Sequence, residues 1–114
     1  MIENYRFGEI TINGKKYRRD LIILPDKIID NWWRKEGHNL CIDDLREVLE
    51  EDIDILIIGT GYYGFMKVPE KVVNKLKENG IDVIVKSTRE ACKVFNEMSS
   101  SKDKKIAAAF HLTC

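Results

Sequence analysis

Three things are missing from this 114-residue sequence: a long hydrophobic run, an excess of one charge, and glutamine. The longest apolar stretches, residues 55–61 and 106–110, are far shorter than the roughly 20 residues that a transmembrane helix needs, so we expect no membrane span. The 19 Lys and Arg residues balance the 19 Asp and Glu residues. Although residues 15–19 form a basic run, this balance and the lack of a recognised motif argue against nucleic acid as a partner.

The amino terminus also lacks a targeting signal. Residues 1–4 have neither the basic start nor the apolar stretch of a secretory signal peptide, and they show no mitochondrial presequence, so we expect a reducing, cytoplasmic location. No linker or repeat divides the chain, and its length suits one domain over residues 1–114. The charge is uneven, however: residues 1–66 carry −4 and residues 67–114 carry +4, which favours attraction within the fold or between subunits.

The first half of the chain is predicted to contain strands and one helix. Asn13-Gly14 is the strongest hairpin signal, because both positions of a tight hairpin turn need positive φ. It predicts strands at residues 7–12 and 17–24. Residues 28–34 are expected to form another short strand, and residues 42–49 a helix with an acidic outer face.

The second half alternates strand and helix. Strands are predicted at residues 53–58, 83–85 and 106–112. Helices are predicted from Pro69 to Gly80 and from the capping box Ser87-Thr88-Arg89-Glu90 onward. The alternation favours an α/β domain with parallel strand pairs, because a helix returns the chain to the same end of the sheet.

Three stretches, taken in order, resemble the Mth-domain family of unknown function: residues 7–17, residues 54–61, and residues 88–96 with Ala107-Ala108-Ala109. The resemblance implies a three-layer α/β domain with a mixed, largely parallel central sheet flanked by helices, plus an accessory N-terminal β-hairpin. It also implies a site and a tendency to act through partners. It implies no reaction.

A glycine loop follows the most apolar predicted strand. Gly59-Thr60-Gly61-Tyr62-Tyr63-Gly64 fits the G-x-G-x-x-G pattern of dinucleotide sites, or it is a tight exit from the strand. In a dinucleotide site a helix begins within the motif and an acidic residue ends the next strand. Here the helix waits until Pro69, and Asp82 begins the next strand. We therefore favour the tight exit and expect no cofactor.

A pocket is predicted where the parallel strands end, because loops gather there in α/β sheets. Its candidate residues, from the two strand exits and the following helix, are Gly59, Thr60, Gly61, Ser87, Thr88, Cys92 and Asn96. The free N–H groups at that helix start could hold a small anion. Cys92 is a candidate nucleophile, but its apolar neighbours favour a buried structural thiol, and no catalytic residue can be named.

Two short motifs have zinc-like spacing, His38-x-x-Cys41 and His111-x-x-Cys114. Such pairs arise easily by chance, Cys114 is the last residue, and the family resemblance implies no metal. We therefore expect no metal. His38 is expected in a loop hydrogen bond and His111 on the last strand.

Aromatic residues point to partners, because exposed Trp and Tyr often anchor interfaces. The candidate interface residues are Trp32, Trp33, Tyr62, Tyr63 and Phe65. Two functions stay open. The first is a non-catalytic protein-binding or assembly module that forms a homo-oligomer or binds a protein partner. The alternative is a small-molecule or anion-binding enzyme that uses the predicted pocket.

Overall fold

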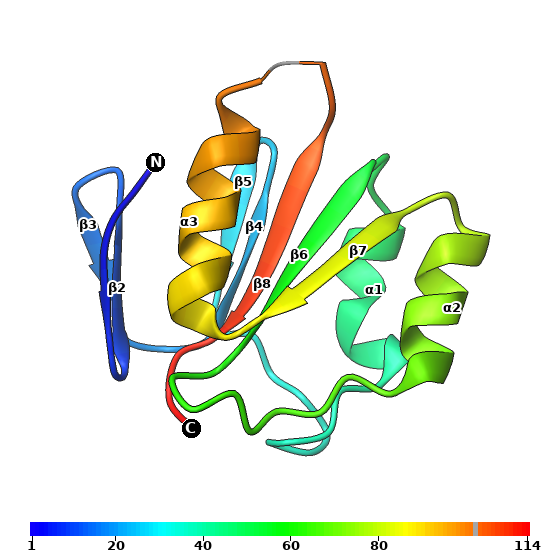
Figure 1. Cartoon of the computed structure of the whole chain (residues 1–114), viewed down its shortest axis with the longest axis horizontal. Coiled ribbons are helices and arrows are strands. Elements are labelled where there is room, and N and C mark those ends of the chain that lie inside the picture. The colour runs from blue at the N-terminus through cyan, green and yellow to red at the C-terminus, as the bar shows by residue number, and fades with distance from the viewer. Residues whose placement is uncertain (102) are drawn as a thin grey trace.

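The structure, a computed structural model, describes residues 1–101 and 103–114. It is an α/β fold with two sheets (Figure 1). A three-stranded antiparallel sheet has the order β1-β2-β3 and contains β1 (Ile2–Arg6), β2 (Glu9–Ile12) and β3 (Lys15–Tyr17). A five-stranded sheet has the order β5-β4-β8-β6-β7 and contains β4 (Leu21–Leu24), β5 (Lys27–Asp30), β6 (Ile55–Thr60), β7 (Asp82–Lys86) and β8 (Ile106–His111).

Two longer helices connect the parallel strands. They are α2 (Glu70–Glu78), with Pro69 as its N-cap, and α3 (Thr88–Ser99). The predicted acidic helix is a 3₁₀ turn, η1 (Ile42–Leu45), continued by the short α1 (Arg46–Leu49). In the part of the chain that the structure describes, no helix is long and apolar enough to span a bilayer.

The N-terminal hairpin is confirmed at its turn and corrected in its second strand. Asn13 and Gly14 both have positive φ, 49° and 84°, as the turn requires. The strand expected at residues 17–24 is divided, because β3 ends at Tyr17 and the fully buried β4 belongs to the other sheet. The strand β1, which the sequence pattern did not predict, makes the hairpin a three-stranded sheet.

The central sheet is mixed, as expected, with two parallel and two antiparallel strand pairs. Strand β6 pairs parallel with β7 and β8, whereas β4 pairs antiparallel with β5 and β8. The antiparallel pairing of β4 with β5 follows from their connection, because a two-residue turn, Pro25-Asp26, allows only antiparallel pairing. The strand expected at residues 28–34 ends at Asp30, because Asn31 follows in the left-handed region with φ 68°.

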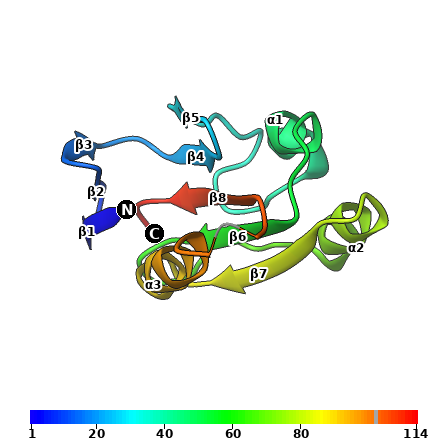
Figure 2. The ribbon, with the colours of Figure 1, turned by 90° about the horizontal axis from the view of Figure 1, so that it is seen from above.

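The core divides along the strand pleat. On β6, Ile55 and Ile57 join a cluster with Phe95 of α3, whereas Leu56 and Ile58 join a second cluster with Leu76 of α2. Successive side chains of a strand point to opposite faces, so the central sheet is buried on both. Figure 2 shows the three-stranded sheet set off at one end of the central strands. The first cluster includes Ile2 and Ile10, and so joins that small sheet to the core.

Candidate functional site

The loop after β6 is fixed by hydrogen bonds to residues far away in the sequence. Tyr62 N–H donates to the carbonyl of Thr113 (2.6 Å), and Phe65 N–H donates to that of Cys114 (3.0 Å). Within the loop, Met66 N–H donates to the carbonyl of Thr60 (3.1 Å). These backbone donors are therefore occupied by protein carbonyls, and the loop has a defined conformation.

The glycines of this loop allow close packing. At Gly61 the φ angle is 110°, and an added Cβ would lie 2.6 Å from the carbonyl oxygen of Cys114. At Gly59 an added Cβ would lie 2.8 Å from both Phe110 Cδ1 and Thr88 Oγ1. These distances are too short for a side chain, so close packing at this end of the sheet requires glycine at both positions.

Thr88 joins the glycine loop to β8. Its buried hydroxyl accepts a hydrogen bond from Gly61 N–H (2.8 Å) and donates one to the carbonyl of His111 (2.6 Å). Its own N–H donates to the carbonyl of Gly61 (3.1 Å). The predicted capping box is wrong, because the N-cap Ser87 makes no side-chain cap bond and the neighbouring loop satisfies this first donor of α3.

The other predicted pocket residues also have partners within the protein. Thr60 donates its hydroxyl proton to the carbonyl of Lys86 (3.1 Å). Asn96 accepts from Ile2 N–H (2.9 Å) and donates to the carbonyl of Ile2 (2.8 Å), which ties β1 to α3. Cys92 is buried, and burial raises the pKa of its thiol to about 12.

The structure separates the predicted pocket into two places. Gly59, Gly61 and Thr88 pack together at the end of the central sheet. Cys92 and Asn96 instead line a cavity of about 230 Å³ between α3 and β1, with Arg89 and Tyr5. Burial raises the pKa of the Tyr5 hydroxyl, which donates to the carbonyl of Leu112 (2.8 Å).

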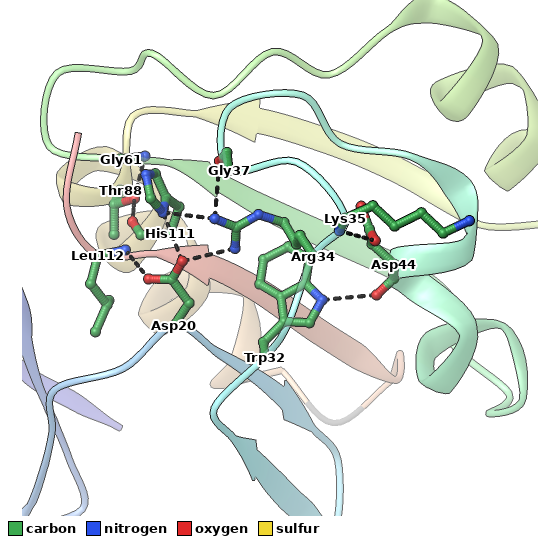
Figure 3. Close-up of polar contacts among 10 residues, drawn as sticks. All are labelled: Asp20, Trp32, Arg34, Lys35, Gly37, Asp44, Gly61, Thr88, His111 and Leu112. Carbon is green, nitrogen blue, oxygen red and sulfur yellow. Dashed lines mark hydrogen bonds and ion pairs between the residues drawn. The ribbon is translucent and has the colours of Figure 1, made fainter.

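A buried polar cluster, which the sequence pattern did not predict, lies beside the end of β8 (Figure 3). Asp20 Oδ2 accepts from Arg34 Nη1 (2.8 Å) and lies 2.7 Å from His111 Nδ1. Its other oxygen accepts from the N–H of Leu112 (2.8 Å). The same Nδ1 of His111 also lies 3.1 Å from Arg34 Nη2, so the ring nitrogen stands between a carboxylate, which can only accept, and a guanidinium, which can only donate. The cluster joins residues before β4, after β5 and at the end of β8.

The charge on Asp20 is stabilised by these partners. Burial opposes its ionisation, but hydrogen bonds from His111, from the backbone of Leu112 and from Arg34 outweigh burial and hold its pKa below the ordinary value. The side chain of Arg34 is only 5% exposed. Its guanidinium also lies 4.7 Å from the ring centre of Trp32. The side chains of this cluster therefore stabilise one another inside the fold.

Four aromatic rings gather where β6 ends, and we call them the aromatic surface: Phe7, Tyr62, Tyr63 and Phe65. Consecutive ring centres are 5.9 Å apart for Phe7 and Tyr62, 5.1 Å for Tyr62 and Tyr63, and 5.7 Å for Tyr63 and Phe65. Their exposed fractions are 49%, 37%, 61% and 58% in sequence order. Such a group of exposed rings is typical of an interaction site.

The aromatic surface is supported from below. Tyr5, which is buried, has its ring centre 6.3 Å from that of Tyr62. The guanidinium of Arg89 lies 5.3 Å from the Tyr62 ring centre and donates to the Tyr62 hydroxyl (3.3 Å). Tyr62 is therefore held between the core and α3, and its ring lies against those of Phe7 and Tyr63.

The two predicted interface tryptophans lie apart from these rings. Trp32 is buried, and its Nε1–H donates to the carbonyl of Asp44 (2.8 Å). Trp33 is 73% exposed and lines a separate cavity with Lys35 and Glu47. Among the described residues, no ring contact joins either tryptophan to the aromatic surface.

Of the two zinc-like motifs, the structure brings the two histidines together. The rings of His38 and His111 lie edge to face, with centres 5.7 Å apart. Residues 1–101 and 103–114 contain no group of three or more His, Cys, Asp or Glu side chains placed to hold a metal ion.

The fold and this site define a small α/β domain with an accessory antiparallel sheet and an exposed group of rings. Comparison with known proteins identifies its family. The chain belongs to the family described as protein of unknown function (DUF498/DUF598), whose sequence model matches residues 2–111. The resemblance to the Mth-domain family is thereby confirmed.

The solved structures that are similar in fold include the following two. The conserved hypothetical protein PH1505 from Pyrococcus horikoshii OT3 has a TM-score of 0.82 and 32% identity, over 100% of this chain and 99% of that one. A Bordetella pertussis protein, described as a Mth938-like domain, has a TM-score of 0.76 over 98% of this chain and 85% of that one. At 14% identity it shows the fold alone.

The curated relatives include an assembly factor. NADH dehydrogenase [ubiquinone] 1 alpha subcomplex assembly factor 3 from Danio rerio is 32% identical over 112 residues. The match covers 96% of this chain but 62% of that protein. The chain therefore spans less than two thirds of the length of this relative.

Proposed function

We propose that this chain is a non-catalytic binding module that assists the assembly of other proteins, and that the aromatic surface is its partner-binding site. The observation that carries the proposal is the exposure of Phe7, Tyr63 and Phe65 on a fixed backbone. Rigid aromatic anchors lose little conformational entropy on binding, so they can provide affinity even when the buried interface is small. The role of the Danio rerio relative as an assembly factor supports this class of function.

The arrangement of polar atoms supports binding over catalysis. The hydroxyls of Thr60 and Thr88 and the amide of Asn96 each bond a backbone group. A catalytic pocket needs such groups aimed at a substrate. The small-molecule enzyme therefore has less support than the binding module, and its remaining candidate is Cys92.

We expect Cys92 to resist alkylation. At neutral pH a thiol with a pKa of about 12 holds almost no thiolate, and the side chain is only 6% exposed. In the folded protein, iodoacetamide should modify Cys92 about a hundredfold or more slowly than Cys41 and Cys114, which are partly exposed. Peptide mass spectrometry measures each rate, with the denatured chain as the reference. Equal rates in the folded protein would favour the enzyme.

The double substitution Tyr63→Ser and Phe65→Ser should weaken binding without unfolding the domain. Both rings are more than half exposed, so little core packing is lost. Loss of two interface anchors should weaken capture of the native partner from cell extract by about thirtyfold. Trp33→Ser is the matched control, because Trp33 is equally aromatic, more exposed and outside the aromatic surface. If both variants capture the same proteins as the natural chain, the aromatic surface is not the binding site.

A further inference from the structure

Strand β7 forms an edge of the central sheet, and Figure 2 shows it on the far side of β6 from β8. Asp82 N–H donates to the carbonyl of Asp54 (2.9 Å), so at this position the N–H faces β6. Backbone directions alternate along a strand, which turns the N–H and C=O groups of Val83 and Val85 outward. Val85 is 40% exposed, and no strand in the described residues pairs with this side.

We infer that β7 pairs antiparallel with β7 of a second copy of this chain, about a two-fold axis that passes Ile84. In this register Val83 lies opposite Val85 of the partner subunit, and Ile84 lies opposite itself. The outward groups of each valine pair then face one another and can exchange both of their hydrogen bonds. Ile84 and the strand ends occupy the alternating positions without these bonds, where opposite side chains are closest.

Charge supports this partner. The same register places Asp82 opposite Lys86 of the partner subunit, and the symmetry repeats the pair at the other end of the strand. Both side chains are exposed, and neither makes an ion pair with another described residue. Opposite charges that face each other across antiparallel strands stabilise the pair. A second copy of β7 is thus complementary to β7 in charge and in hydrogen bonding.

Apolar packing supports it too. Val83 and Ile84 are partly buried, and they pack against the two core clusters on opposite faces of the sheet. Pairing across the axis would extend both clusters into the partner subunit. The interior of this edge has the sequence Val-Ile-Val, without the proline or lysine that usually protects an exposed edge.

The other edge of the central sheet does not have this complementarity. Strand β5 begins at Lys27 and ends at Asp30. The two residues are separated by an odd number of positions, so their backbone N–H groups point to opposite sides of the strand. Antiparallel self-pairing places two residues opposite each other only when their N–H groups point to the same side, so Lys27 cannot face Asp30 of a second copy. Asp30 is also paired with Arg19 at 3.2 Å.

The edges of the small sheet are unsuitable as well. Strand β3 has three residues and begins with adjacent lysines, Lys15 and Lys16, which would repel a second copy. On β1, the amide of Asn96 already binds both backbone groups of Ile2. Of the edges in the described part of the chain, β7 alone is open, apolar and self-complementary.

A charge exchange tests the register. We expect the natural chain to be a dimer by sedimentation equilibrium, and Asp82→Lys or Lys86→Asp alone to weaken dimerisation by about tenfold or more, since two facing pairs become repulsive. The double variant Asp82→Lys with Lys86→Asp restores both pairs and should dimerise like the natural chain. Circular dichroism and thermal melting should show that all the variants are folded, because both side chains are exposed.

A second variant tests the hydrogen bonds. Val85→Pro removes an outward N–H and leaves the ladder to β6 intact, so it should be monomeric. The inference is overturned if the natural chain is a monomer up to high micromolar concentration, or if the single reversals dimerise unchanged. Neither outcome bears on the aromatic surface as a binding site, because Tyr63 and Phe65 are not part of β7. Failure of partner capture by the aromatic surface would likewise leave the dimer intact.

Discussion

Replacing Asp20 by alanine is expected to lower the free energy of unfolding by about 3–5 kcal/mol, because it strands a buried charge. The guanidinium of Arg34, whose side chain is 5% exposed, loses its carboxylate partner at 2.8 Å. The N–H of Leu112 and the ring of His111 lose the same acceptor. Urea denaturation of the natural chain and the variant measures the difference.

An exposed ion pair supplies the control. Arg19 and Asp30 form a bridge of the same chemical type at 3.2 Å, but their side chains are 62% and 40% exposed. Asp30→Ala should therefore cost about 1 kcal/mol or less. A second control is Arg34→Met on the Asp20→Ala background, which removes the stranded charge and should recover part of the loss. Equal costs for Asp20→Ala and Asp30→Ala would contradict the role of the buried cluster.

The cost of Asp20→Ala should also depend on pH. The pKa of Asp20 is lower in the folded chain than in the unfolded chain, where it is about 4. The ionised carboxylate therefore contributes its full stability above about pH 4–5, and this contribution is lost as pH falls through the folded pKa. Urea titrations at pH 7 and in acid should show that the natural chain and the variant become more alike as pH falls.

Gly61→Ala should be the second severe substitution, with a loss of more than about 4 kcal/mol. An alanine there is strained by the positive φ of 110°, and its Cβ would overlap the carbonyl of Cys114, whose backbone must move. That movement also disturbs the hydrogen bond from Phe65 to Cys114, and with it the loop that presents the aromatic surface. Chemical denaturation and the yield of folded protein measure the effect.

Two other glycines separate the backbone cost from the overlap. Gly80 has a similarly positive φ of 80°, but an added Cβ would meet nothing within 4 Å. Gly80→Ala should therefore cost only about 1–2 kcal/mol. Gly37 has neither a positive φ nor a close neighbour, so Gly37→Ala should be nearly neutral. If Gly61→Ala lowers the free energy of unfolding no more than Gly80→Ala does, the loop is not as tightly packed against Cys114 as we describe.

The sequence pattern predicted those elements that depend only on residues close to one another in the chain. The positive-φ turn at Asn13-Gly14 and the apolar strand β6 could be read from neighbouring residues alone. The division between β3 and β4 could not. It depends on β8, which is nearly ninety positions later and pairs with the apolar half of the predicted strand, as at Leu21 and Phe110. Long-range pairing thus decides which sheet a short strand joins.

The site shows the same limit. Tyr62, Tyr63 and Phe65 could be predicted as loop aromatics, because they follow a buried strand directly. Their contact with Phe7 and the burial of Trp32 depend on the packing of separate elements. Asp20 and His111 are 91 positions apart, and no spacing rule connects them. Side-chain clusters of this kind become visible only in the folded chain.

The most direct test of the proposed function is photo-crosslinking in the cells that naturally produce this chain. Tyr63 is replaced by the photoreactive analogue benzoylphenylalanine, and Trp33, which is exposed but outside the aromatic surface, is replaced in a matched variant. We predict a defined protein adduct from position 63 that is absent from position 33 and disappears when Phe65→Ser is added. Identical adducts from both positions, or none from position 63, would contradict the aromatic surface as the partner-binding site.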